Sequence, residues 1–588
     1  MQQPQPTAMG IDLHTEQTLV EMLMNRSALM GDKLALAFFS NGETLDQSLS
    51  YRQLDQRARA IAVSLMDRGL HGRRVLLLYP SGLEYLAAFF GCLYAGVVAV
   101  PVYPPQMGKQ MLRIQAIIQD SQSELFLTDR RIYDNLVQNL PEFMAATAGK
   151  WMFTEDTDPG QAGLWQMPGL SGDSLAFLQY TSGSTGLPKG VMVSHGNLLN
   201  NERIVRVAYS HDEHSDFAGW LPLYHDMGLI GNVLQPLFLG STSYLFSPMS
   251  FIQKPVRWLQ LISRYRAHTS GAPNFAYDLC VQKVSEAEKA TLDLSSWKVA
   301  YNGAEPVRAH TLRNFAAAFA SCGFQPQQLF PCYGMAEATL FVAGGPKGRD
   351  LVITPVNREA LQQDQIVFEP EGSPDAQELV GCGPVWGDHR VRIVNPETFE
   401  ALPDAVVGEI WLQGPSVCQG YWNRPELSDE TFRARLAGED EGPFLRTGDL
   451  GFLRAGELYI TGRLKDLIII RGRNHYPQDI ELTVAQSHPV LHAGSGAAFP
   501  LDVDGEERLV VIQEIDPGLF RTADPEEIFM AVRKAVTLGH ELQLHEIVLV
   551  KRRTVPKTSS GKIQRRASKQ QYLDGELQTE ASWKAQPA

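Results

Sequence analysis

The spacing of apolar residues along this chain predicts helices that alternate with strands. After Ser50, with Gln53 at the capping-box position, apolar residues at 54, 58, 61, 62, 65 and 66 form one face at helical spacing. An apolar strand is predicted next, over residues 73–80. Strands without polar alternation are typical of strands buried on both faces, so the pattern predicts a layered α/β fold.

One uncharged stretch, residues 85–108, is long enough to span a bilayer. Glycines at 91 and 96 and prolines at 101, 104 and 105 interrupt it, and its second half is rich in β-branched residues. We therefore predict a buried helix over about 82–95 and a buried strand over about 97–103, rather than a membrane span.

The same pattern resumes further along the chain. Residues 175–180 predict a buried strand that leads into a glycine-rich loop, followed by a strand at 191–194 and a helix that begins near Asn197. Residues 345–379 are polar and acidic, which predicts a surface insertion. Near residue 463 the composition changes again, and we predict that the residues after it form a separate small α+β domain.

Composition narrows the class of protein. The 588 residues include 52 Lys+Arg and 66 Asp+Glu, a formal net charge of −14, with 44 % hydrophobic and 20 % charged residues. These values are ordinary for a globular protein and argue against a disordered chain, a collagen-like fibre and a dedicated nucleic-acid binder. The six cysteines form no metal-knuckle spacing, and the N-terminus resembles no secretory signal, so we expect a reducing, cytoplasmic location.

The strongest chemical signal is the segment from Thr181 to Gly190, directly after a predicted buried strand. Its hydroxyls and glycines allow backbone N–H and side-chain O–H groups to surround phosphate oxygens, while Lys189 adds positive charge. It is not a Walker loop, because Pro188 stands where that motif needs glycine. A flexible Ser/Gly loop is the alternative interpretation. The candidate phosphate-binding residues are Thr181, Ser182, Gly183, Ser184, Thr185, Gly186 and Lys189.

This loop resembles the phosphate loop of the adenylate-forming superfamily, which includes acyl-CoA synthetases, peptide-synthetase adenylation domains and luciferases. The superfamily's other motifs follow in the expected order at 301–306, 333–337, 446–449, 462–466 and 556–562. The resemblance implies a large N-terminal AMP-binding domain of layered α/β subdomains over 1–462, which carries the 345–379 insertion. It also implies a hinge at 463–466 and a small mobile α+β domain over 467–588.

The chemistry that the resemblance implies is attack of a substrate carboxylate on the α-phosphorus of ATP. Because this gives an acyl adenylate and pyrophosphate without a protein nucleophile, catalysis depends on positioning and on cations near the developing charge. ATP and Mg²⁺ are the expected cofactors.

Roles follow from the same resemblance. Lys562 would bridge the substrate carboxylate and the α-phosphate, Glu337 would help to hold Mg²⁺, and Tyr333 would stack on adenine. Asp449 would accept both ribose hydroxyls, with Arg463 beside it, and Lys465 matches the hinge position. The remaining expected nucleotide contacts are Gly303, Ala304, Glu305, Gly334, Met335, Ala336 and Ile460.

Each of these residues also has a plain structural interpretation. Asp449 could cap a turn, Glu337 could be a surface acid, and Lys465 could belong to an exposed linker. Lys562 lies in a basic segment, residues 551–569, with eight basic and no acidic side chains, which favours polyphosphate and an acidic protein partner.

Two histidine pairs could suggest metal sites, but their context and spacing do not support that function. His211 and His214 belong to an acidic turn. His540 and His545 are one residue too far apart for a zinc-protease motif.

Within the superfamily, residues 223–228, 270–276, 333–340 and 473–481 resemble those of fatty acyl-AMP ligases, as does the insertion. These enzymes pass the acyl group to the phosphopantetheine thiol of a holo acyl carrier protein or of a carrier domain in a polyketide or nonribosomal peptide synthase. At Tyr224 and His225 there is no anion for a substrate amine, so a medium- or long-chain fatty acid is expected. His225 would contact the acyl carboxylate or gate its tunnel, or be a structural histidine. Ala336 replaces the superfamily's usual threonine, which leaves the α-phosphate contacts less defined.

Three alternatives remain open at this point. The first is a fatty acyl-CoA synthetase that uses free coenzyme A, and the second is a non-catalytic acyl or nucleotide binder. A luciferase-like monooxygenase is the third. No nucleic-acid partner and no transmembrane segment are expected.

Overall fold

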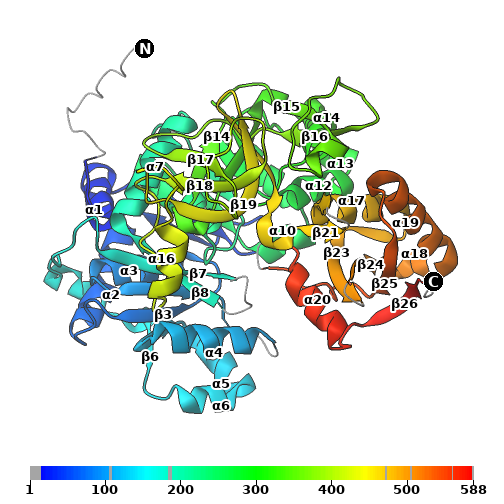
Figure 1. Cartoon of the computed structure of the whole chain (residues 1–588). Coiled ribbons are helices and arrows are strands. Elements are labelled where there is room, and N and C mark those ends of the chain that lie inside the picture. Colours follow the sequence, from blue (N-terminus) through cyan, green and yellow to red (C-terminus); the bar gives the residue numbers. More distant parts are fainter. Residues whose placement is uncertain are drawn as a thin grey trace.

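Two sheets, each built mostly of parallel strands, form the larger part of the protein, with helices between them. The computed structural model describes residues 15–104, 109–182, 188–470, 473–503, 506–558 and 561–585. In Figure 1 the C-terminal part, drawn in orange and red, lies to one side of the rest.

The larger sheet has eight strands, of which the inner six are parallel. Its edge strands β2 and β14 run antiparallel to their neighbours. The strands in spatial order are β14 (Phe341–Gly344), β13 (Leu329–Gly334), β12 (Val299–Asn302), β11 (Thr269–Gly271), β9 (Phe217–Gly219), β10 (Ser243–Phe246), β1 (Leu34–Phe39) and β2 (Gln47–Ser50).

The second sheet has six strands, and all but the last run parallel. In spatial order they are β6 (Trp151–Phe153), β5 (Leu125–Thr128), β3 (Arg74–Leu78), β4 (Val98–Val102), β7 (Leu175–Ser182) and β8 (Pro188–Ser194). The antiparallel pair β7–β8 sets Thr181 opposite Lys189, at the two ends of the predicted phosphate loop. Residues 183–187 of that loop lie outside the described residues.

Helices between the two sheets build the main core. Helices α1 (Leu19–Met30), α2 (Tyr51–Met66), α3 (Leu83–Tyr94) and α7 (His195–Ala208) contribute buried residues to a cluster that includes strands of both sheets. The predicted helix and strand within residues 82–103 are confirmed as α3 and β4. The capping box at Ser50 and Gln53 is also present, at the start of α2. Because these strands are covered on both faces, their sequences are continuously apolar.

The remaining helices of the larger part lie mostly around the sheets. They are α4 (Lys109–Ser121), α5 (Arg130–Asn139), α6 (Pro141–Ala146), α8 (Asp226–Leu229), α9 (Gln235–Leu239), α10 (Pro248–Gln253), α11 (Val256–Tyr265), α12 (Asn274–Lys283), α13 (Glu286–Lys289), α14 (Ala309–Phe319), α15 (Arg358–Leu361) and α16 (Pro425–Phe432). A π-helical turn, Ile230–Leu234, joins α8 to α9.

A third, antiparallel sheet leads to the C-terminal part. Its strands are β17 (Arg390–Val394), β18 (Gly408–Gln413), β19 (Leu445–Arg454) and β20 (Glu457–Arg463). The predicted insertion, residues 345–379, contains β15 (Ile353–Asn357), α15 and nearly all of β16 (Ala376–Val380). The predicted surface insertion is not exposed throughout, because Val356, Leu361 and Ile366 are buried in a cluster with Tyr459.

The C-terminal part has its own sheet and core. A short helical turn, Leu464–Asp466, follows β20 and leads to β21 (Ile468–Ile470) and β22 (Arg473–His475). The main sheet is β23 (Leu491–Val503), β24 (Glu506–Ile515), β25 (Leu544–Val550) and β26 (Thr579–Lys584). Helices α17 (Pro477–Ser487), α18 (Pro517–Phe520), α19 (Pro525–His540) and α20 (Arg565–Leu573) complete it.

Polar contacts join the insertion to the C-terminal part. The Asn474 side chain donates to Asp364 Oδ2 over 2.9 Å, and the Gln377 side chain donates to Asp479 Oδ2 over 2.8 Å. Arg473 forms an ion pair with Glu359 of the insertion at 3.3 Å. These contacts define the arrangement of the two parts in this structure.

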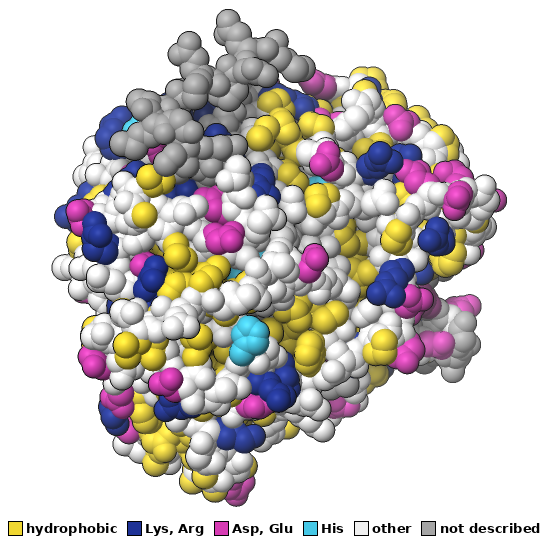
Figure 2. Space-filling view, turned by 90° about the vertical axis from the view of Figure 1, so that its left-hand side faces the viewer, with side chains coloured by type: hydrophobic (Ala, Val, Ile, Leu, Met, Phe, Trp, Pro, Cys, Tyr) yellow, Lys and Arg dark blue, Asp and Glu magenta, His cyan; other side chains and the backbone are white. Residues whose placement is uncertain are grey.

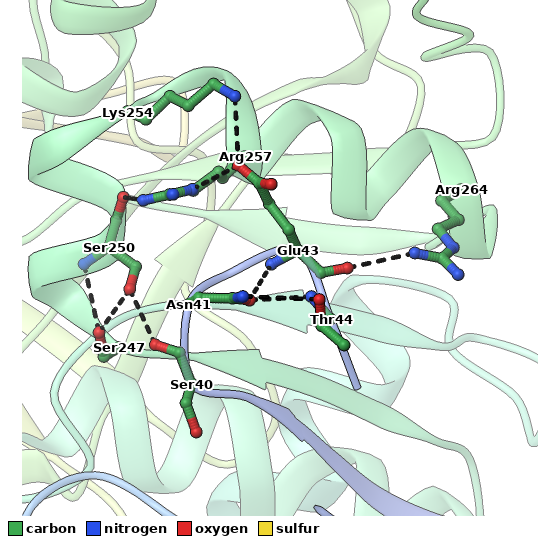
Figure 3. Close-up of polar contacts among 9 residues, drawn as sticks. All are labelled: Ser40, Asn41, Glu43, Thr44, Ser247, Ser250, Lys254, Arg257 and Arg264. Atoms are coloured by element: carbon green, nitrogen blue, oxygen red, sulfur yellow. Dashed lines mark hydrogen bonds and ion pairs between the residues drawn. The ribbon is translucent and has the colours of Figure 1, made fainter. Parts of the chain in front are cut away.

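A cluster centred on Glu43 ties the β1–β2 turn to two helices (Figure 3). Glu43 Oε1 accepts from Lys254 at 3.1 Å and from Arg257 at 3.0 Å, while Ser250 of α10 donates to the Ser40 carbonyl at 3.0 Å. The cluster therefore fixes α10 and α11 against the edge of the larger sheet.

The surface in Figure 2 carries small apolar clusters among charged side chains of both signs. Within the described ranges, no helix is both long and apolar enough to cross a membrane.

We expect loss of Arg26 from its buried ion pair with Glu16 to destabilise the protein strongly. Their side chains are 0 % and 1 % exposed and 3.0 Å apart, and Arg26 also donates to the Phe238 carbonyl. Arg26→Met leaves the buried carboxylate without its partner, so the free energy of unfolding should fall by about 3 kcal/mol. Denaturant unfolding followed by circular dichroism measures this loss.

The matched control is Arg52→Met, which removes a surface pair whose side chains are 51 % and 92 % exposed. Its cost should stay below about 1 kcal/mol. Equal losses in the two variants would contradict the assigned importance of burial.

Candidate active site

A large cavity of about 2380 Å³ lies where the C-terminal part meets the rest of the protein. Tyr333 and Gly303, at the carboxyl ends of neighbouring parallel strands, line it from one side, and Lys562 lines it from the other. Ligands of α/β proteins bind at this edge of a parallel sheet.

The carboxylate of Asp449, on β19, is held from two directions inside this cavity. The Tyr333 hydroxyl donates to Oδ2 over 2.8 Å, and Arg463 Nε donates to Oδ1 over 3.0 Å. Asp449 is only 8 % exposed at its side chain, and its charge raises the pKa of the Arg463 guanidinium. Each carboxylate oxygen keeps a lone pair for a further donor, so the group can accept two hydroxyls side by side.

The turn that presents Asp449 is anchored by Glu409, a residue that sequence reasoning missed. Glu409 is 2 % exposed and accepts from Trp411 Nε1 at 2.9 Å, Arg446 Nε at 3.0 Å and the Gly448 N–H at 3.1 Å. An acid inside the apolar strand at 408–413 was the available signal, because acids are seldom fully buried without partners.

Glu337 and Lys189 lie at the side of the cavity that Tyr421 lines. The Tyr421 hydroxyl donates to Glu337 Oε1 over 2.8 Å, and burial raises the pKa of Glu337. Tyr421 is a second site residue that the sequence did not predict. Lys189 Nζ lies 5.0 Å from the centre of the same tyrosine ring. Burial, and after it the ammonium group of Lys465, lower the pKa of Lys189, so the two lysines face the same region.

The arrangement around Glu337 fits a magnesium ion that is shared with phosphate. Among the described residues, no three His, Cys, Asp or Glu side chains form a metal cluster. Mg²⁺ in nucleotide enzymes is usually held by one or two carboxylates together with phosphate oxygens, and the Glu337 carboxylate lines the same cavity as Lys189.

His225 and Asp226 form a close pair at the start of α8. His225 Nδ1 lies 2.5 Å from Asp226 Oδ1. Burial alone would raise the pKa of the Asp226 carboxyl, but His225 and the Lys562 ammonium outweigh that effect and hold this pKa below its usual range. The pair therefore belongs to the same electrostatic site as Lys562.

The loop that carries Lys562 is closed by its own backbone and docks on α12. The Thr558 N–H donates to the Lys562 carbonyl over 2.7 Å, and the Lys562 N–H donates to Thr558 Oγ1 over 3.0 Å. Gly561 has φ = +88°, and a Cβ there would lie 2.9 Å from the Phe275 ring. This position therefore requires glycine both for its backbone and for its contact.

The ammonium group of Lys562 is surrounded by carboxylates. Burial, and after it the Arg463 guanidinium, lower its pKa, while Asp226, Glu305 and Asp449 act in the opposite direction. A buried lysine in such a site can stabilise negative charge that develops nearby.

The backbone at 303–305 forms another wall. A Cβ on Gly303 would lie 2.8 Å from the Cys332 carbonyl, and Ala304 has φ = +71°. Glu305 Oε1 accepts from the Asn274 N–H over 3.0 Å, which fixes the direction of this turn.

The structure brings most of the predicted site residues into this one cavity. Those that line it are Thr181, Lys189, His225, Gly303, Ala304, Glu305, Tyr333, Gly334, Met335, Ala336, Glu337, Asp449, Ile460, Arg463, Lys465 and Lys562. Ser182 ends β7, and Gly183, Ser184, Thr185 and Gly186 lie outside the described residues.

The histidine pairs His211/His214 and His540/His545 do not line this cavity. His211 is buried and contacts Thr269, and His540 contacts Thr483.

Comparison with known proteins defines the class. Residues 25–422 match the family model described as AMP-binding enzyme, and residues 465–582 match that of the Disco-interacting protein 2-like AMP domain. A fatty acid AMP ligase from Legionella pneumophila has a similar structure, with a TM-score of 0.76, 40 % identity and coverage of 98 % of this chain and 99 % of that chain. A fatty acyl-adenylate ligase from the same organism, in complex with acyl adenylate and pyrophosphate, is also similar in structure. Its TM-score is 0.76 and its identity 39 %, with coverage of 97 % of this chain and 99 % of that chain.

Sequence relatives narrow the class. The medium-chain fatty acid–acyl-carrier-protein ligase JamA of Moorena producens is 47 % identical over 95 % of this chain and 96 % of that protein. The corresponding ligase TtuA of Teredinibacter turnerae is 36 % identical over 96 % and 95 %. The chain belongs to the AMP-binding enzyme family and, within it, to the fatty acyl-AMP ligases.

We predict that Glu409 controls nucleotide affinity through the turn that carries Asp449. Glu409→Gln weakens the acceptor for Arg446 and the Gly448 N–H, so the affinity for AMP should fall about tenfold. Isothermal titration calorimetry measures the change. Glu441→Gln is the matched control, because Glu441 pairs with Arg392 of the same sheet at 2.9 Å, outside the cavity. An unchanged affinity in folded Glu409→Gln would refute the assignment.

Proposed function

We propose that this protein activates a medium- or long-chain fatty acid with ATP and then transfers the acyl group to the phosphopantetheine thiol of an acyl carrier protein. The observation that carries the proposal is that Lys562, from the C-terminal part, enters the same cavity as Asp449, Tyr333 and His225. The names of JamA and TtuA as medium-chain fatty acid–acyl-carrier-protein ligases, and the bound acyl adenylate in the Legionella relative, support it.

In the first step, a carboxylate oxygen of the fatty acid bonds to the α-phosphorus of ATP. The bond between that phosphorus and the oxygen bridging to the β-phosphorus breaks, and pyrophosphate leaves. Lys562 neutralises negative charge on the carboxylate and the α-phosphate, which would otherwise repel each other. His225, held by Asp226, lies on the acyl side of this reaction.

The nucleotide is oriented by residues on the other side of the cavity. Asp449 accepts the two ribose hydroxyls, and Arg463 lies beside it. Tyr333 stacks on adenine, opposite the backbone of Gly303 to Glu305, while Gly334, Met335, Ala336 and Ile460 complete the wall. Thr181 and Lys189 bind the phosphates together with Ser182 and residues 183–186. Fixing both reactants in this way supplies much of the rate enhancement, because no covalent enzyme intermediate is needed.

Glu337 holds Mg²⁺ in this proposal, with Tyr421 fixing the carboxylate. The ion, when bound, neutralises charge on the ATP phosphates. Lys189 acts at the same phosphates.

In the second step, the carrier thiol attacks the acyl carbon of the adenylate. A C–S bond forms, the bond from the acyl carbon to the phosphate-linked oxygen breaks, AMP leaves with that oxygen, and the thiol proton passes to solvent. Lys465, in the turn at 464–466, would be the hinge about which residues 467–588 turn between the two steps. The basic segment 551–569 favours an acidic carrier protein or a carrier domain of a polyketide or nonribosomal peptide synthase.

A cytoplasmic location also belongs to this proposal. All six cysteines are free, and Cys92, Cys280, Cys382 and Cys418 are buried. Unpaired thiols suit a reducing compartment.

Lys562→Ala should abolish pyrophosphate release while ATP still binds, because the charge at the reacting centre is lost. In the wild type, the lowered pKa of Lys562 means that its charge is lost at a lower pH than for a free lysine. The rate should therefore fall as pH rises toward the ordinary lysine range. Lys562→Arg retains residual activity and lacks this alkaline fall. Near-normal turnover by Lys562→Ala would refute the role.

The acceptor is tested by offering holo acyl carrier protein and free coenzyme A side by side after adenylation. We expect acyl transfer to the carrier at least about tenfold faster than to coenzyme A. Equal rates would identify an acyl-CoA synthetase. No pyrophosphate release with any fatty acid would identify a non-catalytic binder.

A further inference from the structure

One branch of the cavity is lined by residues of α7 and of the larger sheet. Trp220 lines the cavity just after β9, and Phe217 lines it at the beginning of the same strand. The other side chains that line this branch are Val205, Tyr209, Met227, Tyr301, Cys332, Leu340 and Phe341. Its lining is predominantly apolar, as an acyl chain requires.

Tyr209 and Phe217 are 6 % and 1 % exposed and form a wall of this branch, here called the end wall, and His211 packs against both rings. The His211 ring is 5.2 Å from the Tyr209 ring and 5.1 Å from the Phe217 ring, centre to centre. His211 is buried and is not among the residues that line the cavity. The end wall therefore has an aromatic surface with a polar layer behind it.

That polar layer is a continuous chain of hydrogen bonds across five parts of the sequence. Lys347 Nζ lies 3.5 Å from His268 Nε2, and His268 Nδ1 lies 2.8 Å from Thr269 Oγ1. The same hydroxyl lies 2.8 Å from His211 Nε2, and His211 Nδ1 lies 3.4 Å from the Gln235 amide. With its oxygen toward His211, the Gln235 amide donates through nitrogen to the buried Glu202 carboxyl.

The direction of donation along the chain follows from its first member. A lysine can only donate, so His268 accepts at Nε2 and donates from Nδ1 to Thr269. The Thr269 hydroxyl then donates to His211 Nε2, and His211 Nδ1 donates to Gln235. Burial lowers the pKa of His268 to about 4 and that of His211 well below its usual value, and raises the pKa of Glu202. The buried members are therefore neutral, and every link uses one donor and one acceptor.

Lys347 also fixes the backbone next to the end wall. Its Nζ donates to the carbonyl of Ser210 over 3.1 Å, and Ser210 lies between Tyr209 and His211 with φ = +49°. The polar chain thus holds the Tyr209 ring from behind and the adjoining backbone from the side. Such a fully connected buried network allows few alternative positions for the groups that it contacts.

We propose that the Lys347–His268–Thr269–His211–Gln235–Glu202 chain positions Tyr209 and Phe217 and thereby sets the longest acyl chain that the enzyme accepts. His211 and Thr269 are positioning residues, since neither lines the cavity. The proposal rests on the proposed function, because it takes a fatty acid as the occupant of this branch.

The test is a chain-length profile of kcat/KM for pyrophosphate release, measured with saturated fatty acids of increasing length. His211→Ala leaves a void behind the end wall into which the aromatic rings can turn. The ratio of kcat/KM for the first acid longer than the wild-type optimum to that at the optimum should rise at least about tenfold, with an unchanged KM for ATP. Thr269→Val, which removes the shared hydroxyl, should shift the ratio in the same direction by a smaller factor.

Two further variants separate positioning from general stability. His211→Gln can still accept from Thr269 and should restore the wild-type profile. Thr354→Val removes a different buried hydroxyl, which contacts the Tyr459 hydroxyl at 2.8 Å outside this branch, and should leave the profile unchanged. Because the profile is a ratio within one variant, partial unfolding does not alter it.

The possible results are distinguishable. A profile like the wild type in folded His211→Ala and Thr269→Val would overturn the inference and leave the proposed function intact. A wild type that releases no pyrophosphate with any fatty acid would overturn the proposed function itself. If His211→Ala fails to fold, the comparison of Thr269→Val with Thr354→Val decides the question.

Discussion

The carboxylate of Asp449 is the point at which three parts of the molecule meet. Tyr333 of the larger sheet donates a hydrogen bond to it, and Glu409 of the antiparallel sheet holds its turn by accepting from the Gly448 N–H. Arg463, the last residue before the connection to the C-terminal part, also donates to it. Tyr333 and Arg463 donate to this one buried anion, and Glu409 accepts from the N–H of the residue before it, so the position of Asp449 is tied to all three. A nucleotide that binds Asp449 is therefore placed relative to the parallel sheet and to the start of the C-terminal part at once.

The second constraint is the docked position of the Lys562 loop. Gly561 can approach the Phe275 ring only because it lacks a Cβ, and this contact places the lysine near Asp226, Glu305 and Asp449. Contacts between the insertion and the C-terminal part hold the same arrangement from further away. The structure thus holds Lys562 and Asp449 in one cavity.

Much of the architecture could be predicted from local sequence. Continuous apolar runs identified the buried strands, and the capping box at Ser50 located the start of α2. Motif order identified residues that lie far apart in the chain and meet in one cavity. The core of the insertion was missed because Val356, Leu361 and Ile366 are isolated among polar residues and become buried only against the neighbouring sheet. Glu409, Tyr421 and the polar chain behind Tyr209 depend on contacts between distant segments, which a sequence pattern does not show.

The most direct test of the account follows an oxygen atom. The enzyme is given a fatty acid labelled with heavy oxygen in its carboxylate, ATP and holo acyl carrier protein, and the released AMP is examined by mass spectrometry. Attack on the α-phosphorus predicts one labelled oxygen in each AMP and none in pyrophosphate. AMP without label would contradict acyl-adenylate formation in this cavity.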